Sequence, residues 1–272
     1  MSTILITGAN KGLGFETARQ LLAAGHAVYV GARDEGRGRA AAEALGARFV
    51  RIDVTDDASV GAAAKSVEAD GGLDVLVNNA GIELRNPDNS VPGAGDLTAD
   101  VLRELFDTNV FGLVRVTHAF LPLLRRSSAP VVVNVSSGLA SLAHLSDPDH
   151  PAFAYPGVAY PASKTTVNML TVQYAKALGG MRVNAVEPGF TATDLNGHAG
   201  IQTVEQGARI IVRMAQVGPD GPTGTYVDAN GPLPWLGVSA GPQTICSRQS
   251  RNRSSTVRPG WKYSVTPAIA VG

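Results

Sequence analysis

The sequence predicts an α/β fold in which helices cover both faces of a doubly wound, mostly parallel sheet, within a single domain. Short apolar runs alternate with longer amphipathic stretches, which is the order of parallel strands joined by crossover helices. The run Val131–Val133 is continuously apolar rather than alternating, as expected of a strand that is buried on both faces. A chain of 272 residues is long enough for one large core but too short for two comfortable catalytic domains.

The elements follow in a regular order along the chain. The strands are predicted at Thr3–Thr7, Ala27–Ala32, Ala47–Ile52, Val75–Val77, Val131–Val135 and Arg182–Val186. The helices are predicted at Gly12–Ala24, Gly36–Leu45, Asp56–Asp70, Thr98–Arg125, Val158–Leu178 and Thr203–Gln216. Two connections, Ile82–Asp96 and Gly138–Gly157, are longer than the fold requires, and long loops in a compact domain are usually functional or disordered.

Composition and charge favour a protein that acts on small molecules. Lysine plus arginine and aspartate plus glutamate both number 23, so no global field draws the chain to nucleic acid or to an anionic membrane. No apolar run reaches the roughly 18 residues of a spanning helix. The single cysteine, Cys246, cannot form an intramolecular disulfide, and no basic leader precedes the first strand. We therefore expect a cytoplasmic location, with no nucleic-acid or membrane partner.

The composition changes after Trp235, which predicts a folded domain over 1–235 and a basic C-terminal extension over 236–272. The extension has no acidic residue, and its charged side chains are Arg248, Arg251, Arg253, Arg258 and Lys262. A basic tail can bind a partner. Because too few apolar residues are present to order it, we interpret it as a disordered or non-native extension.

A glycine-rich turn joins the first strand to the first helix. It reads Thr7-Gly8-Ala9-Asn10-Lys11-Gly12-Leu13-Gly14. Glycines at such a turn let backbone N–H groups and the helix N-terminus approach a pyrophosphate. The glycine spacing alone also fits a plain turn, but the strand before it and the helix after it favour a Rossmann-like dinucleotide site.

The end of the second strand favours NADP over NAD. Rossmann domains that bind NAD place an acidic residue there for the ribose 2′-hydroxyl, whereas this chain has Ala32-Arg33. A guanidinium can grip a 2′-phosphate through paired, charge-assisted hydrogen bonds. Lys11 and Arg37 can add charge to the same pocket, although each alone is as easily a solvated surface charge.

The segment Tyr160-Pro161-Ala162-Ser163-Lys164 places a phenol and an ammonium one helical turn apart. A tyrosine titrates near 10, so acid/base work at neutral pH requires a stabilised phenolate, and a nearby ammonium provides this. The pair alone is a weak signal. Tyr155 has a similar local sequence but Ala159 four residues on, so we interpret it as a loop residue or a wall of the substrate pocket.

These residues together resemble the short-chain dehydrogenase/reductase family, in the branch with a Thr-Gly-x-x-x-Gly-x-Gly turn and similar to the carbonyl reductases. The resemblance covers Thr3 to about Trp235. Besides the turn and the tyrosine-lysine pair, it rests on family motifs in family order: Asp53-Val54, Asn78-Asn79-Ala80-Gly81, Asn109, Asn134-Val135-Ser136-Ser137 and Pro188-Gly189-Phe190-Thr191-Ala192-Thr193.

The resemblance implies a role for each matching position. Ser137 would bind the substrate oxygen, and Tyr160 would donate the proton and also contact the cofactor. Lys164 would bind the nicotinamide ribose and lower the tyrosine pKa, and Asn109 would hold a relay water. Asp53 would meet the adenine, with Val54 beside it. Asn79, Ala80 and Gly81 would brace the sheet beside the cofactor, and Pro188, Gly189, Thr191 and Thr193 would contact the nicotinamide. The expected activity is NADP(H)-dependent interconversion of a carbonyl (ketone, aldehyde or quinone) and an alcohol, by hydride transfer with coupled protonation.

Several points stay open at this stage. Leu139, Tyr155 and Phe190 either line an apolar substrate pocket or pack the long loops down. The carbonyl reductases are often monomeric, whereas many relatives pair the helices equivalent to Thr98–Arg125 and Val158–Leu178, so either a monomer or a homo-oligomer fits. The histidines and aspartates of 144–150 do not suggest a metal, since the run is broken by proline and the reaction needs no Lewis acid. A non-catalytic NADP-binding sensor or scaffold on the same fold is the alternative function.

Overall fold

The structure, a computed structural model, describes residues 1–236. Within this part of the chain the strands form one sheet, parallel throughout, in the order β3-β2-β1-β4-β5-β6-β7. The strands are β1 (Thr3–Thr7), β2 (Ala27–Ala32), β3 (Arg48–Arg51), β4 (Val75–Asn78), β5 (Val131–Val135), β6 (Arg182–Val186) and β7 (Tyr226–Val227). The order reverses between β1 and β4, so this is a doubly wound, Rossmann-like sheet, as the sequence predicts.

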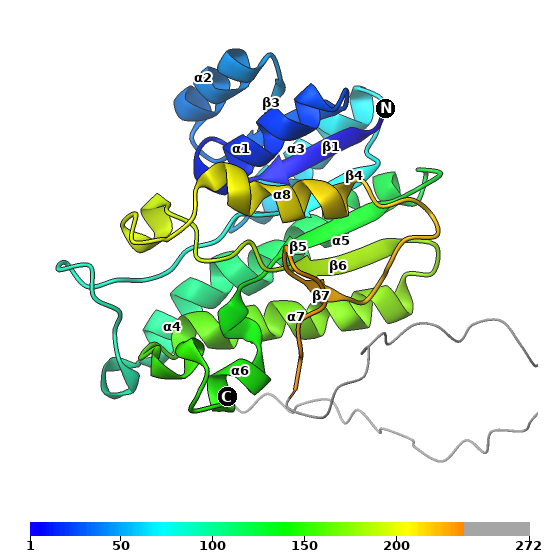
Figure 1. Ribbon diagram of the computed structural model, residues 1–272. Helices are drawn as coiled ribbons and strands as arrows, with labels where there is room; N and C mark the ends of the chain where they lie inside the picture. The colour runs from blue at the N-terminus through cyan, green and yellow to red at the C-terminus, as the bar shows by residue number, and fades with distance from the viewer. Residues whose placement is uncertain (237–272) are drawn as a thin grey trace, which may run out of the picture.

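Helices cover both faces of this sheet (Figure 1). The α-helices are α1 (Gly12–Ala23), α2 (Glu35–Leu45), α3 (Asp57–Ala69), α4 (Ala99–Phe106), α5 (Gly112–Leu124), α6 (Leu142–Ser146), α7 (Ala159–Ala177) and α8 (Val204–Ala215). Short turns of other helical types are η1 (Ala94–Asp96), η2 (Asp107–Phe111), η3 (Gly138–Ala140), η4 (Pro151–Ala154) and η5 (Asp194–Asn196).

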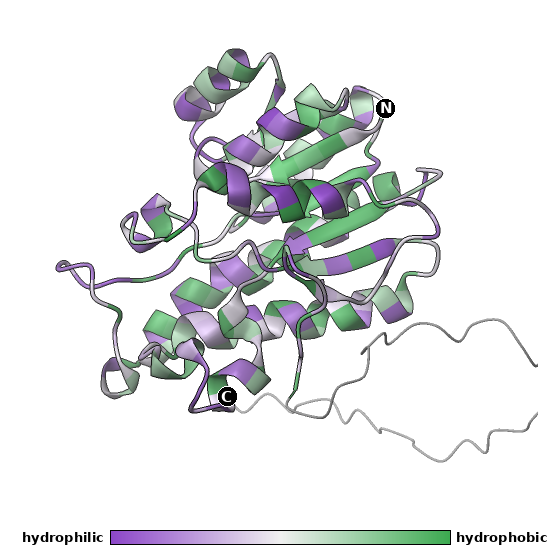
Figure 2. Ribbon diagram, in the orientation of Figure 1, coloured by the Kyte–Doolittle hydropathy of each residue, from purple (hydrophilic) through white to green (hydrophobic). Residues whose placement is uncertain are grey.

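The core has two halves, one on each face of the sheet. Successive β1 side chains alternate between them: Ile4 and Ile6 pack with α1, α2 and α8, whereas Leu5 packs with α3, α5 and the end of α7. The strands are apolar along most of their length, while each helix carries an apolar side and a polar side (Figure 2). Burial on both faces explains why the strands are continuously hydrophobic.

Besides the short helices η1, η3, α6 and η4 in the two connections expected to be loops, the structure differs from the predicted elements in two places. The stretch predicted as one helix, Thr98–Arg125, is broken by the π-helical turn η2, which holds the expected site residue Asn109. Strand β7 was not predicted, because it is only two residues long and lies in a glycine- and proline-rich segment. The ring of Trp235 packs at a tilt against that of Tyr226 in β7, with 5.1 Å between the ring centroids.

Two further sequence expectations concern membrane-spanning helices and the C-terminal extension. Among residues 1–236, no helix has both the length and the apolar character that crossing a bilayer requires. Apart from Leu236, the predicted extension 236–272 lies outside the described residues.

Candidate active site

A cleft of about 1600 Å³ opens at the carboxyl ends of the strands. Every residue that the sequence analysis assigned to the cofactor lines it, from the glycine turn after β1 to Thr193 after β6. So do Ser137, Tyr160 and Lys164, and the predicted pocket residues Leu139, Tyr155 and Phe190. Asn109 does not line the cleft, since its side chain is buried behind it. The strand order thus brings segments nearly 190 residues apart in sequence to one place.

The glycine turn is tightly packed against the loop after β4. Gly8 and Gly12 have φ of +65° and +56°, a left-handed conformation that favours glycine. A Cβ at Gly14 would lie 2.6 Å from Asn79 Nδ2 and 2.7 Å from the Gly8 oxygen. Asn79 donates from that nitrogen to the oxygens of Thr7 and Gly8, at 2.8 and 3.2 Å. Glycine is therefore required at position 14 for the backbone to pack this closely.

The N-terminus of α1 is suited to an anionic group. Helices α2, α3 and α8 are each capped by a side chain, those of Asp34, Asp56 and Thr203. The N-cap of α1, Lys11, makes no such bond, and the first turn of α1 has no acidic residue. Uncapped N–H groups at the positive end of a helix dipole bind phosphates well. The cradle therefore fits the pyrophosphate of a dinucleotide.

The three basic residues of this region have different surroundings. Lys11 Nζ pairs with Asp194 Oδ2 at 2.6 Å, and Arg37 pairs with Asp34, the cap of α2, at 3.2 Å. Arg33 forms no ion pair with any other residue of 1–236. The acidic residue nearest the end of β2, Asp34, is thus engaged in capping a helix, and Arg33 is the free cation beside it.

Asp53 lies in a polar loop after β3. Its Oδ1 accepts hydrogen bonds from the backbone N and the hydroxyl of Thr55, at 3.0 and 2.8 Å. Burial pushes the pKa of the carboxyl up, but these hydrogen bonds and the charge of Arg33 outweigh it and hold the pKa below its usual value. Asp53 is therefore a carboxylate at neutral pH and can accept hydrogen bonds from a ligand.

The side chains of Ser137, Tyr160 and Lys164 converge in the cleft. Ser137 follows β5, and Tyr160 and Lys164 lie on the first turns of α7, with Lys164 Nζ 5.7 Å from the centre of the Tyr160 ring. Burial and the carboxylate of Glu83 raise the pKa of Tyr160, while the nearby Ser137 hydroxyl lowers it. Burial lowers the pKa of Lys164 from 10.5 to about 8. Its ammonium donates to the Val135 oxygen at 2.8 Å.

Asn109 fixes the path of the chain after β4. Its Oδ1 accepts from Ile82 N at 2.8 Å, and its Nδ2 donates to the Ile82 oxygen at 2.9 Å and to Ser163 Oγ at 3.1 Å. A Cβ on the neighbouring Gly81 would lie 3.3 Å from Asn109 Oδ1 and 3.5 Å from Lys164 Nζ. The amide thus joins the loop after β4 to α7 directly behind Lys164, and the role of Asn109 in a water relay stays a prediction.

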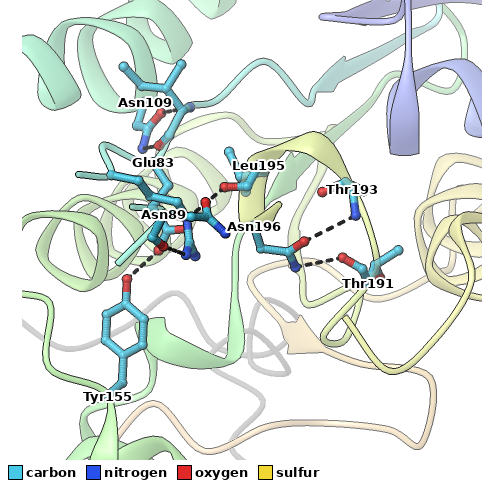
Figure 3. Close-up of polar contacts among 10 residues, drawn as sticks. Glu83, Asn89, Asn109, Tyr155, Thr191, Thr193, Leu195 and Asn196 are labelled. Atoms are coloured by element: carbon cyan, nitrogen blue, oxygen red, sulfur yellow. Dashed lines mark hydrogen bonds and ion pairs between the residues drawn. The ribbon is translucent and has the colours of Figure 1, made fainter. Parts of the chain in front are cut away.

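The loop after β6 is held by a second amide. Asn196 Nδ2 donates to the Thr191 oxygen at 2.9 Å, and its Oδ1 accepts from Thr193 N at 3.2 Å (Figure 3). Phe190, at the start of this loop, is 53% exposed, so it does not pack the loop down but remains free at the cleft. Leu139 is partly buried in η3.

Sequence reasoning missed several charged residues of the cleft, and three of them lie near Tyr160 or beside recognised motifs. Glu83 and Arg85 lie just beyond the Asn-Asn-Ala-Gly segment, and Glu187 precedes Pro188. Figure 3 shows Tyr155 pointing toward Glu83, to which its hydroxyl donates. Burial raises the pKa of Glu187, and the nearby backbone N–H groups of Gly189 and Gly138 partly offset this. The only sequence signal for these residues was their position next to recognised motifs.

Comparison with known proteins places the chain in a family. The family model described as short chain dehydrogenase matches residues 2–203. The short-chain dehydrogenase anuI of Penicillium roqueforti is 38% identical over 79% of this chain and 88% of its own. The (+)-neomenthol dehydrogenase of Arabidopsis thaliana is 34% identical over 78% of this chain and 90% of its own.

A solved structure agrees with these relatives. The NADPH-bound carbonyl reductase from chicken fatty liver superimposes with a TM-score of 0.75 at 26% identity, over 86% of this chain and 99% of that one. The region 2–203 that the family model matches contains the glycine turn, the Ser136-Ser137 pair and the tyrosine-lysine pair. The chain belongs to the short-chain dehydrogenase/reductase family of oxidoreductases.

Proposed function

We propose that this protein is an NADP(H)-dependent oxidoreductase that interconverts a carbonyl compound and an alcohol, with Tyr160 as the general acid/base. The observation that carries the proposal is the meeting of Tyr160, Ser137 and Lys164 in the cleft that also contains the glycine turn. The NADPH bound to the carbonyl reductase neighbour supports the choice of cofactor. The name of the neomenthol dehydrogenase relative supports an alcohol or carbonyl substrate.

The cofactor would be held at both ends of the cleft. The turn Gly8–Gly14 and the uncapped end of α1 would hold the pyrophosphate. Arg33, with no carboxylate partner among the described residues, would bind the 2′-phosphate of NADP, and Asp53 would accept from the adenine amine. When bound, the reduced nicotinamide supplies the hydride that the carbonyl carbon accepts.

The chain's own residues would manage the proton. The Ser137 hydroxyl donates a hydrogen bond to the carbonyl oxygen and orients it toward the Tyr160 phenol. Because burial raises the phenol pKa, Tyr160 keeps its proton at neutral pH and can donate it to the oxygen as negative charge develops there. Lys164 then stabilises the phenolate, since its ammonium lies beside the ring and remains mostly protonated below its pKa of about 8.

The test is NADPH oxidation across a panel of ketones, aldehydes and quinones, with Tyr160→Phe beside the wild type. Loss of the acid should lower kcat by about 10²- to 10⁴-fold. NADPH binding, followed by fluorescence, should be nearly unchanged because the contacts proposed for the pyrophosphate and the 2′-phosphate are retained. Undiminished turnover in Tyr160→Phe would remove Tyr160 from the mechanism. A wild type that binds NADPH but reduces no carbonyl would favour a sensor or scaffold instead.

A further inference from the structure

Three segments that are far apart in sequence meet at one buried ion pair in the cleft. They are the connection 82–96 after β4, the insertion 138–157 before α7 and the loop 190–200 after β6. We call Glu83, Arg85 and Tyr155 the loop clamp, because each of the three segments contacts it (Figure 3). All three clamp residues line the cleft, which Tyr160 also lines.

The contacts of the clamp are numerous for so few side chains. Arg85 Nη2 and Nε donate to Glu83 Oε2 at 2.5 and 2.9 Å. Arg85 Nε also donates to the Leu195 oxygen at 3.1 Å, and Nη1 donates to the Asn89 oxygen at 2.9 Å. The Tyr155 hydroxyl donates to the other carboxylate oxygen, Glu83 Oε1. Both oxygens of Glu83 therefore have donors, and each nitrogen of Arg85 has an acceptor.

Because the ion pair is buried, losing either partner would be energetically costly. The Glu83 side chain is 5% exposed and that of Arg85 is 19% exposed. A charge this far from water is tolerated only when it is paired and hydrogen-bonded, and removing one partner leaves the other charge uncompensated. The pair therefore gives the cleft wall two opposite charges with no net charge, and neither charge is available to a ligand while the other is in place.

The clamp lies close to the proposed acid. Glu83, Tyr155 and Tyr160 also share the wall of a smaller neighbouring cavity, which is otherwise lined mainly by apolar side chains. The charge of Glu83 raises the pKa of Tyr160, which is a further sign that the two groups are near each other. Glu187 contributes a second carboxyl group to the same cleft. A substrate carbonyl that reaches Tyr160 must therefore lie beside this wall.

We propose that the loop clamp is the specificity-determining element of the substrate pocket, and that its internally neutralised ion pair selects uncharged carbonyl compounds over carboxylate-bearing ones. The proposal rests on the proposed function, whose substrate class it narrows. The Arg85 guanidinium could attract an anion only if it were unpaired, but it is paired with Glu83. Leu139 and Phe190 add apolar surface to the lining of the cleft. Tyr155 acts as a positioning residue, which holds the insertion against Glu83.

The proposal is tested with a matched pair of ketones that share one carbon skeleton and differ only in a methyl ester against a free carboxylate. The quantity measured is the ratio of kcat/KM for the ester to kcat/KM for the acid, at fixed saturating NADPH. The wild type should favour the ester. Glu83→Gln frees Arg85 inside the pocket, so this ratio should fall by about tenfold or more.

Two variants serve as controls for the charge. Arg85→Gln leaves Glu83 without its cation, so the ratio should rise rather than fall. The double variant Glu83→Gln/Arg85→Gln restores a neutral wall and should return the ratio to near the wild-type value. A purely structural role would not produce opposite shifts that cancel in the double variant, because loosening the fold affects both ketones alike.

Tyr155→Phe separates positioning from charge. It removes one donor to Glu83 but retains both charges, so KM should rise severalfold for both ketones with the ratio unchanged. NADPH binding by each variant, measured by fluorescence, shows whether it has folded, and Arg85→Met, which also removes the charge, replaces Arg85→Gln if that variant does not bind.

Parallel losses on both ketones in Glu83→Gln and Arg85→Gln, or no change in the ratio, would overturn the clamp as a selector. These results differ from failure of the proposed function, in which the wild type itself would reduce neither ketone with NADPH.

Discussion

At the scale of single residues, burying the charged side chain of Lys164 in the site lowers the stability of the folded protein. The residue is 5% exposed, and its ammonium has one hydrogen-bond acceptor among the described residues, the Val135 oxygen. An ammonium so poorly compensated destabilises the folded state, and the lowering of its pKa to about 8 measures this. Such a loss of folding stability is expected where the charge is needed to stabilise a phenolate at Tyr160.

Replacing this lysine should therefore stabilise the protein without cofactor. Lys164→Met is expected to increase the free energy of unfolding at pH 7 by about 2 kcal/mol, the desolvation cost less the lost hydrogen bond. The same variant should lose carbonyl reduction. Chemical denaturation at pH 7 measures the first effect and NADPH oxidation the second.

The difference in unfolding free energy between Lys164→Met and the wild type should depend on pH in a definite direction. The pKa of Lys164 falls from 10.5 to about 8 on folding, so between these values the unfolded chain binds more protons than the folded one. This group therefore makes the wild type more stable as pH rises through that window, and the advantage of Lys164→Met should shrink there. A variant that is less stable than the wild type at pH 7 would contradict the reasoning.

Which site residues the sequence could predict depends on where their partners are. Tyr160 and Lys164 were predictable because they lie four residues apart on one helix, and the glycine turn because it lies between a strand and a helix. Glu83, Arg85 and Glu187 were not, since their partners lie in other loops. The bond from Tyr155 to Glu83 joins residues 72 positions apart, and no local pattern reports such a contact.

At the scale of elements, strands were predicted more accurately than the breaks in helices. β1, β2, β5 and β6 have the predicted bounds, since burial on both faces makes each a continuous apolar run. The π-turn η2 was missed because its cause is tertiary: Asn109 must bond both polar groups of Ile82. One extra residue in a helical turn is a common device at functional sites.

The loop after β6 forms an ion pair with the glycine turn, between Asp194 and Lys11. Both side chains are more than half exposed, so the pair itself adds little stability. Its carboxylate nevertheless occupies the lysine and adds negative charge where the phosphates of NADPH would bind. Asp194→Asn should therefore tighten NADPH binding by about two- to fivefold at low salt, and the gain should vanish at about 1 M salt.

Fluorescence titration with NADPH measures this change in affinity. Asp100→Asn is a matched control, because Asp100 also pairs on the surface, with Arg103 on α4, but does not line the cleft. It should leave NADPH affinity unchanged. Weaker binding by Asp194→Asn would mean that the pair positions the loop for the cofactor instead of competing with it.

At the scale of the whole molecule, the cleft spans the point where the strand order reverses. Arg33 and Asp53 approach it from the β1-β2-β3 side, and Ser137 and Thr193 from the β4-β5-β6-β7 side. A dinucleotide in this cleft would contact both halves of the sheet. Its binding should therefore stabilise the molecule as a unit.

NADPH at 100 times its Kd should add about 2.7 kcal/mol to the free energy of unfolding, since it binds only the folded state. For a domain of this size, that corresponds to a rise in Tm of roughly 5–10 °C. NADH at the same concentration should raise Tm less, because it lacks the 2′-phosphate that Arg33 would bind. Thermal unfolding of the wild type and of Arg33→Asp measures this difference, and equal shifts from both cofactors in the wild type would contradict the preference for NADP.

The two edge strands of the sheet also affect whether the protein aggregates at high concentration. β7 is two residues long, and the chain turns back beside it, with an antiparallel bridge from Val227 to Pro232. At the opposite rim, β3 exposes Arg48 and Arg51 at its ends. A short, self-covered strand and a charged one are poor templates for a strand from another molecule. This architecture should therefore resist edge-to-edge aggregation, although the hydrophobic core consists mostly of valine, isoleucine, leucine and alanine.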